Sequence, residues 1–454
     1  MAGKVNIKYT QLFIDNEFVD AENGATFGTI DPATEEVAAK VAFGTAKKAF
    51  HHDSEWRTMD ASKRGELMIK LAGLMERDKD IIAKLITIDN GKPLSLSEQE
   101  VAFALKVIRY YAGFSDKIHG STLPVDGNFM SYTRKEPVGV VAQIVPWNFP
   151  VAMISWKWGP ALATGCTVVL KPAEQTPLSS LYIASLGVIN IVTGDGPLTG
   201  NAFSKNMDVD KITFTGSTEV GKLISACASD SNLKRSPIVV MNDCPSLDKA
   251  VEICHAAVFT FVGQVCCAGT RVLVQSGIHD EFVKKSAELA KSTQDGPQVN
   301  KEQMEKTLGL IECGVKEGAL VHTGGKRAGS KGYYVEPTVF SNVRDDMTIA
   351  KEEIFGPVQS ILKFDTLEEA IERANDTTYG LAAGIITSNH DAMTRFSQCV
   401  QAGSIWINCY NTVMTQAPFG GFKQSGIGRE LGEEGLRNYL ESKTITIAIN
   451  SKCS

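Results

Sequence analysis

The run VGVVAQIV at residues 138–145 predicts a buried strand, and it opens the part of the sequence that decides the fold. Helical and extended patterns alternate after it. We expect helices at residues 154–162 and 178–186, and strands at residues 167–170, 188–192, 212–214 and 238–241. Short buried strands that alternate with helices are typical of a parallel, doubly wound sheet. The sequence therefore predicts an α/β fold, in which ligands bind at the carboxyl ends of the strands.

The segments outside this region extend the pattern. Helical spacing returns at residues 280–291 and 301–317, which predicts a second α/β unit. Residues 129–135 resemble a hairpin that projects from the main body. The tail from Lys443 to Ile449 alternates strictly between polar and apolar residues. We expect this tail to form a strand that pairs with the hairpin or with another subunit.

Composition and charge indicate the class of protein. The chain has 454 residues, of which 43% are hydrophobic and 22% are charged, as in a globular protein of two or three domains. A formal charge of -6 argues against nucleic acid as the main partner. We see neither a membrane-spanning apolar run nor a leader sequence, and the ten cysteines form no paired framework. We therefore expect a protein of the cytoplasm, with no membrane partner.

The stretch FVGQVCCAGTR at residues 261–271 places a thiol, Cys266, between Gly263 and Gly269. Glycines let a substrate approach the backbone closely, which a reactive thiol needs and a space-filling thiol does not. Most free cysteines in proteins are simply small buried residues, which is how we interpret the adjacent Cys267. Cys266 is therefore a candidate nucleophile.

Two polar motifs follow predicted strands directly. Asn148, within the segment PWNFP at residues 146–150, offers an uncharged amide that can stabilise an oxyanion, although an asparagine in a turn is the simpler interpretation when it is taken alone. Lys171 and Glu174 can converge on a polyol such as ribose, since the ammonium donates and the carboxylate accepts. An incidental surface ion pair is the alternative for these two residues.

Two further motifs suit a dinucleotide. Gly216 and Ser217 lie where a strand turns into a helix, and a capped helix N-terminus binds anions such as pyrophosphate, although many such joints bind nothing. Glu353 precedes Phe355 in the segment EEIFGP at residues 352–357, which suits a second ribose and a nicotinamide ring. A glutamate of this kind is more often a solvated surface group.

The sequence gives less support to other chemistries. The seven histidines show no H-x-x-x-H spacing and the cysteines show no C-x-x-C pair, so we predict no metal site. A cysteine protease would need a histidine from a distant part of the chain, for which there is no local signature.

Taken together, these motifs resemble the NAD(P)-dependent aldehyde dehydrogenase family, and within it the cytosolic and mitochondrial class that oxidises aliphatic aldehydes and retinal. The resemblance covers nearly the whole chain. It is carried by residues 134–150, 159–177, 208–235, 263–271, 350–358 and 418–432. The order of these segments is very specific, although several of them are weak alone.

The resemblance implies an NAD-dependent oxidation of an aldehyde to a carboxylic acid through a thiohemiacetal and a thioester on Cys266, with Asn148 and the backbone N–H of Cys266 holding the oxyanion. Glu174 should repel a 2′-phosphate, so NAD is favoured over NADP. The residues implied to bind the cofactor are Val145, Pro146, Trp147, Lys171, Glu174, Gly196, Pro197, Gly216, Ser217, Gly221, Gln303, Lys306, Glu353 and Phe355. The residues implied to line the substrate tunnel are Phe149, Met153, Trp156, Val413 and Phe419. Val413 stands where some relatives carry a bulky aromatic residue, which implies a wider tunnel.

The sequence departs from the family where the general base belongs. Family members follow a segment like SNLKR, at residues 231–235 here, with a strand that bears Glu-Leu-Gly-Gly-Lys, whose glutamate is the base. In this chain Arg235 runs directly into Ser236, and Glu219, Asp243 or Glu353 are the carboxylates that we consider as substitutes. Three further blocks look shortened, after Phe43, between Leu186 and Gly187, and between Lys291 and Gly296. At the second of these, part of the helix must unravel to reach the next strand.

Three hypotheses follow. The first is an active aldehyde dehydrogenase whose thioester hydrolysis is impaired. The second is a catalytically inactive homologue with a structural, crystallin-like or binding role. The third is an incomplete splice form that folds poorly.

The resemblance also implies a division of the chain and an assembly. We expect an NAD-binding domain from residues 1–118 and 138–235, a catalytic domain from residues 236–424, and an oligomerisation hairpin and tail strand from residues 119–137 and 440–452. The implied partners are a small aldehyde and further copies of the chain, as a dimer or a tetramer.

Overall fold

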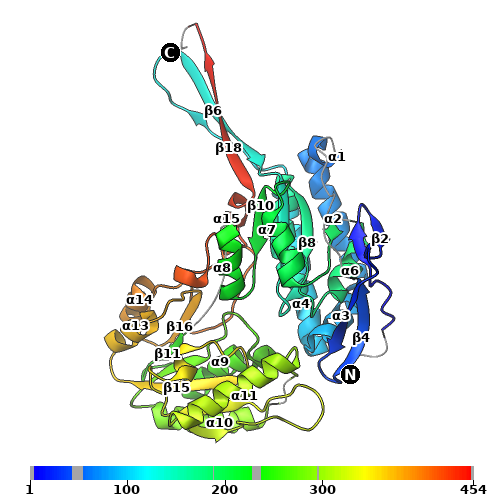
Figure 1. The fold of residues 1–454 in the computed structure, drawn as a ribbon. Helices are drawn as coiled ribbons and strands as arrows, with labels where there is room; N and C mark the ends of the chain where they lie inside the picture. The colour runs from blue at the N-terminus through cyan, green and yellow to red at the C-terminus, as the bar shows by residue number, and fades with distance from the viewer. Residues whose placement is uncertain (1–4, 43–54, 188, 228–236, 294–295, 451–454) are drawn as a thin grey trace.

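The computed structural model describes residues 5–42, 55–187, 189–227, 237–293 and 296–450. These residues form an α/β structure with two large sheets and a projecting ribbon of strands (Figure 1). The predicted fold class is confirmed.

The run at residues 138–145 forms the strand β7 (Val140–Ile144), which lies inside a six-stranded sheet between two parallel neighbours. Val141 faces one hydrophobic core, and Ala142 and Ile144 face another on the opposite side of the sheet. Because the strand is buried on both faces, its residues are apolar except Gln143, whose Nε2 donates to the carbonyl oxygen of Lys157 at 3.1 Å. The strands of this sheet, in spatial order, are β10 (Lys211–Phe214), β7, β8 (Thr167–Lys171), β9 (Asn190–Ile191), β1 (Leu12–Ile14) and β2 (Glu17–Val19).

Helices cover both faces of this sheet, as a doubly wound fold requires. On the face of Val141 pack the helices α2 (Ala61–Arg77), α3 (Lys79–Asn90), α4 (Leu94–Ala112), α5 (Pro150–Thr164) and α6 (Leu178–Ala184). On the face of Ile144 pack α7 (Asn201–Lys205) and α8 (Thr218–Cys227). The helix predicted at residues 154–162 begins earlier, because Pro150 favours the first turn of a helix.

The second sheet has seven strands and is parallel except at one edge, where β13 runs antiparallel to β14. Its strands, in spatial order, are β13 (Leu320–Thr323), β14 (Thr338–Ser341), β15 (Val358–Phe364), β12 (Arg271–Gln275), β11 (Pro237–Val240), β16 (Ala382–Ile386) and β17 (Ser404–Ile407). One face packs against α9 (Leu247–Phe259) and α10 (His279–Lys291). The other face packs against α11 (Lys301–Lys316), α12 (Thr348–Lys351), α13 (Leu367–Asn375) and α14 (His390–Cys399).

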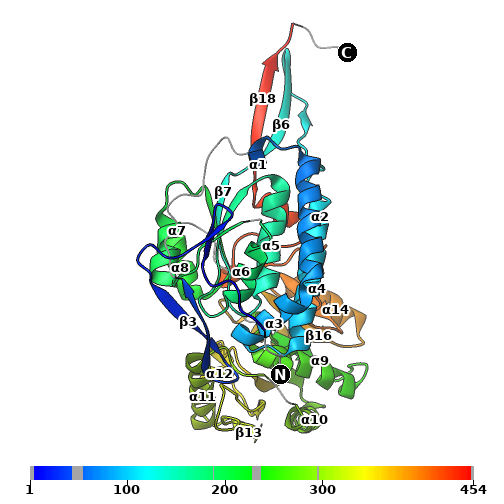
Figure 2. The ribbon, with the colours of Figure 1, turned by 90° about the vertical axis from the view of Figure 1, so that its right-hand side faces the viewer.

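The tail strand pairs with the predicted hairpin. β18 (Leu440–Ala448) lies antiparallel to β6 (Phe129–Pro137), and β5 (Thr122–Leu123) follows on the other side of β6. Figures 1 and 2 show this ribbon projecting from the body of the molecule. The prediction that the alternating tail pairs with the hairpin is therefore confirmed.

The remaining elements are short. They are the hairpin of β3 (Thr26–Asp31) and β4 (Glu36–Ala42), the helices α1 (Glu55–Thr58) and α15 (Glu434–Arg437), and the turns η1 (Gly196–Gly200), η2 (Thr260–Gly263) and η3 (Lys423–Ser425).

The junction after α6 differs from the simple pattern. The helix predicted to reach Leu186 ends at Ala184, and the strand predicted at residues 188–192 is reduced to Asn190–Ile191. Residues 185–187 form a turn in which Gly187 has a φ of 82°. The helix ends early because the residues after Ala184 must form the connection to β9, as the shortened sequence predicts.

The other shortened blocks fall on or beside residues that the structure does not describe. The residues outside the described part include Phe43, Val188, the junction of Arg235 with Ser236, and residues 294–295. The six-stranded sheet uses strands from residues 12–19 and 140–214, and the seven-stranded sheet uses strands from residues 237–407. The division of the chain into the predicted domains stays a prediction.

Candidate active site

A cavity of about 380 Å³ lies at the carboxyl ends of β7, β8 and β10, where a doubly wound sheet is expected to bind its ligand. Its remaining wall comes from loops and a helix of the second sheet. The residues that line it are Ile144, Val145, Pro146, Trp147, Asn148, Phe149, Met153, Lys171, Ala173, Glu174, Gln175, Gly196, Phe214, Thr215, Gly216, Ser217, Val220, Cys266, Gln303, Lys306, Glu353 and Phe355.

The cavity gathers both predicted catalytic residues, Cys266 and Asn148, and most of the predicted cofactor residues. Six of its wall residues were missed by the sequence interpretation: Ile144, Ala173, Gln175, Phe214, Thr215 and Val220. Each of these lies within three residues of a predicted one, so proximity to the motifs was the available signal. Pro197 and Gly221 are not among the wall residues.

Lys171 and Glu174 converge as predicted. The Lys171 Nζ lies 3.3 Å from Glu174 Oε2. The Lys171 side chain is 3% exposed and that of Glu174 is 41% exposed, so the carboxylate faces the solvent side of the cavity. Burial lowers the pKa of the Lys171 ammonium, and the Glu174 carboxylate acts in the opposite direction. The pair presents a donor and an acceptor at the end of β8.

The turn after β10 begins α8 at the cavity. Ser217 Oγ accepts a hydrogen bond from the backbone N–H of Val220 at 3.3 Å, which caps this ten-residue helix. A Cβ on Gly216 would lie 2.5 Å from the ring of Phe214, so only glycine lets the chain turn over this ring. The first N–H groups of α8 therefore face a cavity that has room for an anionic group.

The loop that carries Cys266 has an unusual backbone. Phe261 and Val262 have φ angles of 55° and 50°, and Gly263 follows with 73°. Left-handed backbone is costly for a β-branched residue such as Val262 and is found where the surrounding structure enforces it. Cys266 follows this bend and lines the cavity, whereas Cys267 is 4% exposed and donates from Sγ to Asn411 Oδ1 at 3.4 Å. The structure thus gives the two adjacent thiols different environments.

Gly263 allows this loop to approach the loop of Glu353. A Cβ at position 263 would lie 2.0 Å from the carbonyl oxygen of Gly356. The two backbones therefore touch, and a second, smaller cavity between them is lined by Cys266, Glu352 and Glu353. Glu353 is the carboxylate that both cavities share.

Asn148 is tied to the loop of Cys266. Its Nδ2 donates to the carbonyl oxygen of Gln264 at 3.0 Å, which fixes the orientation of the amide. Gln264 is fully buried and is itself held, because its Oε1 accepts from the N–H of Val299 at 2.9 Å. An amide nitrogen has two hydrogens, so one N–H remains for a ligand in the cavity.

The opposite wall is built around Phe355. Gln303 Nε2 donates to the carbonyl oxygens of Ile354 at 3.1 Å and Phe355 at 3.0 Å. The Phe355 ring meets that of Trp147 edge-on, with centroids 5.4 Å apart. Gln303 thus holds the loop in place, and the two perpendicular aromatic rings form an apolar corner of the cavity.

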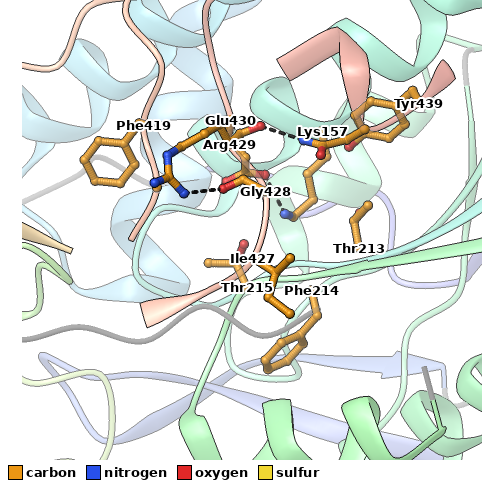
Figure 3. A pocket seen from close by; sticks show the side chains of 12 residues that line it. Lys157, Thr213, Phe214, Thr215, Phe419, Ile427, Gly428, Arg429, Glu430 and Tyr439 are labelled. Atoms are coloured by element: carbon orange, nitrogen blue, oxygen red, sulfur yellow. Dashed lines mark hydrogen bonds and ion pairs between the residues drawn. The ribbon is translucent and has the colours of Figure 1, made fainter. Parts of the chain in front are cut away.

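The five predicted tunnel residues all belong to the hydrophobic cluster against which Cys266 packs, and their role as a tunnel stays a prediction. Phe149 and Met153 line the cavity of Cys266. Trp156 packs edge-on against Phe419 with centroids 5.3 Å apart, and Phe419 lines a different, smaller pocket with Lys157 and Glu430 (Figure 3). Val413 is half-buried against the hydrophobic core.

Gly263→Ala is expected to force the two loops apart. The added methyl group would meet backbone atoms of Gly356, and alanine disfavours a φ of 73°. We expect a melting temperature lower by several degrees and, since Cys266 and Glu353 lose their relative placement, a loss of at least about tenfold in any reaction at Cys266.

The matched control is Gly73→Ala on the exposed face of α2, where an added Cβ has nothing within 4 Å. This change should stabilise the helix by about 0.5–1 kcal/mol. A Gly263→Ala protein as stable and reactive as the control would contradict the close approach.

Two features are absent from the described residues, a metal-binding cluster and a membrane-spanning helix. No group of three or more histidine, cysteine, aspartate or glutamate residues in the described part of the chain is placed to hold a metal ion. Among the same residues, none of the helices combines the length and the apolar character that crossing a bilayer demands.

Known proteins resemble this chain over nearly its whole length. Residues 15–445 match the model of the aldehyde dehydrogenase family. The chain is 52% identical to aldehyde dehydrogenase 1A1 of Gallus gallus over 99% of this chain and 96% of that protein. It is 51% identical to the mitochondrial aldehyde dehydrogenase of Homo sapiens over 98% of this chain and 93% of that protein. The NAD+ complex of aldehyde dehydrogenase from Bacillus cereus superposes with a TM-score of 0.95 at 44% identity, covering 98% of this chain and 97% of that one.

The alignment with the Gallus gallus protein spans 487 positions, which exceeds the 454 residues of this chain. This chain therefore lacks residues that the relative has, in agreement with the shortened blocks inferred from the sequence.

Proposed function

The chain belongs to the aldehyde dehydrogenase family, and we propose that it oxidises an aldehyde to a carboxylic acid with NAD as the oxidant, through an adduct on Cys266. The observation that carries the proposal is the single cavity that contains Cys266, Asn148 and the residues suited to a dinucleotide. We also propose that hydrolysis of the thioester is the slow step, because the family's general-base segment has no counterpart after Arg235.

The donors of the cavity fit NAD. Lys171 and Glu174 suit a ribose, and the capped start of α8 beside Gly216 suits a pyrophosphate. Glu353 and the ring of Phe355 lie on the wall that carries Gln303 and Lys306, where a second ribose and a flat ring would find an acceptor and an apolar surface. When bound, NAD supplies the acceptor for the hydride of the substrate.

The residues of the chain have defined roles in this proposal. The Cys266 thiolate attacks the aldehyde carbon, and the negative charge moves to the carbonyl oxygen. The remaining N–H of the Asn148 amide stabilises that oxygen, and it costs little reorganisation because Gln264 already fixes the amide. Loss of hydride from the adduct leaves a thioester on Cys266.

Hydrolysis of the thioester needs a base for the attacking water. Of the three substitutes considered from the sequence, Glu219 is exposed on α8 and Asp243 Oδ1 accepts from the Thr387 hydroxyl at 2.6 Å. Glu353 is the one of these three that lines the cavities of Cys266. We therefore propose that Glu353 accepts the proton of the attacking water. The water oxygen then displaces the thiolate of Cys266 and releases the carboxylic acid.

The test is rapid mixing of the enzyme with NAD and an aliphatic aldehyde. We expect a burst of one equivalent of NADH per site, followed by turnover slower than the burst by about 10² to 10⁴, the usual contribution of a general base. A linear trace with no burst would overturn the assignment of the slow step.

The same experiment decides the alternative, a catalytically inactive homologue with a structural or binding role, which the missing base segment favours. Such a protein would show a rise in melting temperature with NAD and no burst. A chain that shows neither would be an incomplete, poorly folded form.

Assembly and location remain proposals. The projecting ribbon exposes apolar side chains, with Phe129, Met130 and Ile447 between 45% and 48% exposed. Exposed apolar residues on the two paired strands of this ribbon favour burial against further copies of the chain, as a dimer or a tetramer. We place this homo-oligomer in the cytoplasm.

A further inference from the structure

A fully buried ion pair lies next to the loop of Asn148. Lys92 follows the end of α3 and Glu100 lies on α4, and their side chains are 0% and 1% exposed. The Lys92 Nζ donates to Glu100 Oε2. The roles described above use neither residue.

Lys92 contacts both loops that form the proposed oxyanion site. Its Nζ donates to the carbonyl oxygen of Asn148 at 3.0 Å. The same ammonium lies 3.9 Å from the centre of the Phe149 ring and 4.3 Å from that of the Phe261 ring, at cation–π distance. Phe261 is the first left-handed residue of the Cys266 loop. One cation therefore links the backbone of Asn148 to the bend that precedes Cys266.

Glu100 holds the other side of the Asn148 loop. Its Oε1 accepts from the backbone N–H groups of Val151 at 2.9 Å and Ala152 at 3.0 Å, at the start of α5. These N–H groups lie in the first turn of α5, where backbone N–H groups have no hydrogen-bond acceptor within the helix. The carboxylate also lies at the positive end of the helix dipole. Glu100 thus fixes the position at which α5 begins, two residues after Asn148.

A third contact completes this support, because Asn90 Nδ2 donates to the carbonyl oxygen of Trp147 at 2.6 Å. Residues 147–152 are therefore held at four backbone atoms by side chains from the end of α3, from Lys92 after it and from α4. A buried ion pair is by itself weak evidence for stability, since removing two charges from water costs several kcal/mol per ion. The pair contacts the backbone of one loop on both sides, which indicates that it fixes the position of that loop.

We propose that Lys92 and Glu100 form a positioning pair that sets the Asn148 amide against Cys266. The proposal rests on the proposed function, in which Asn148 stabilises the oxyanion. The pair acts through the backbone of Asn148 and does not touch the reacting atoms.

The test is the double variant Lys92→Met/Glu100→Gln. Methionine keeps much of the apolar volume of the lysine, and the glutamine Oε1 can still cap α5, so neither replacement leaves its former partner as an unpaired buried charge. The bond to the Asn148 carbonyl and the cation–π contacts are lost. We expect the rate constant of the NADH burst to fall by about 10², as for a misplaced catalytic group. The burst amplitude, the NAD dissociation constant and the melting temperature should stay close to those of the wild type.

The control is Arg373→Met/Glu369→Gln on α13. Arg373 Nη1 lies 2.8 Å from Glu369 Oε1, and the two side chains are 17% and 39% exposed. Neither residue lines a cavity of Cys266. The control should leave the burst rate constant within about twofold of the wild type.

Hydrogen exchange of the peptide spanning residues 145–152 gives a readout that does not require activity. We expect faster exchange in the Lys92→Met/Glu100→Gln protein and unchanged exchange in the control. If the wild type shows no burst, the proposed function fails and hydrogen exchange alone decides whether the pair positions the loop. A wild-type burst together with an unchanged burst rate and unchanged exchange in the double variant would overturn the positioning role. An equal loss in both double variants would also overturn it, by showing a general effect on packing.

Discussion

Cys266→Ala is expected to abolish the NADH burst and to lower steady turnover by at least about 10⁴, because binding and oxyanion stabilisation are all that remain without a nucleophile. The thiol lines the cavity that also holds Asn148 and the cofactor residues. The side-chain change is small, so the fold and the cofactor site should persist. The increase in melting temperature with NAD should therefore match that of the wild type.

Cys267→Ala is the matched control for this variant. Cys267 is the next residue, but it is buried and its Sγ donates to Asn411. We expect this variant to keep the burst amplitude, with a modest loss of stability from the lost packing. A burst that survives in Cys266→Ala and disappears in Cys267→Ala would show that the neighbouring thiol is the nucleophile.

At saturating NAD, which offsets any weakening of the ribose contact proposed for Glu353, Glu353→Gln is expected to keep the amplitude of the NADH burst and to lower the steady rate that follows it by about 10². Glutamine keeps the shape of the side chain and cannot take the proton of the attacking water. Hydroxylamine attacks thioesters without help from a base, so adding it should restore steady NADH formation. A lower steady rate that hydroxylamine does not restore would contradict the role in hydrolysis and indicate a role in cofactor binding.

The controls are Glu219→Gln and Asp243→Asn, the other two carboxylates that the sequence offers. Glu219 is exposed on α8 and Asp243 is bonded to Thr387. Both variants should show steady rates within about twofold of the wild type, because neither carboxylate lines a cavity of Cys266. A loss confined to one of these two variants would transfer the role of base to that carboxylate.

The sequence was most informative where one residue pattern has one physical meaning. The apolar run at residues 138–145 can only be buried on both faces, and it forms β7 inside a parallel sheet. The strict alternation of the tail predicts a two-faced strand, and it forms β18 against β6. The lack of a loop after residue 186 predicts an unravelled helix, and α6 ends at Ala184. These features are local, so neighbouring residues suffice to specify them.

The motifs predicted most residues of the candidate site, and the fold places those residues around one cavity. Most of the residues named from the sequence line one cavity because parallel strands end at the same edge of the sheet. Trp156 and Phe419 lie in the hydrophobic cluster of Cys266 but pack on each other, so their place in a substrate tunnel stays a prediction. Side-chain direction depends on packing, which sequence spacing does not describe.

By itself, the sequence determined the fold class, the candidate thiol and the absence of the base segment, because strand patterns, glycine spacing and motif order are properties of neighbouring residues. Only the tertiary structure decided which carboxylate shares a cavity with Cys266 and which buried charges hold Asn148. Glu353 lies 87 positions after Cys266, and Lys92 lies 56 positions before Asn148. Contacts over such separations arise from the pairing of strands within one sheet and from the packing of helices on a sheet, and no local pattern in the chain encodes them.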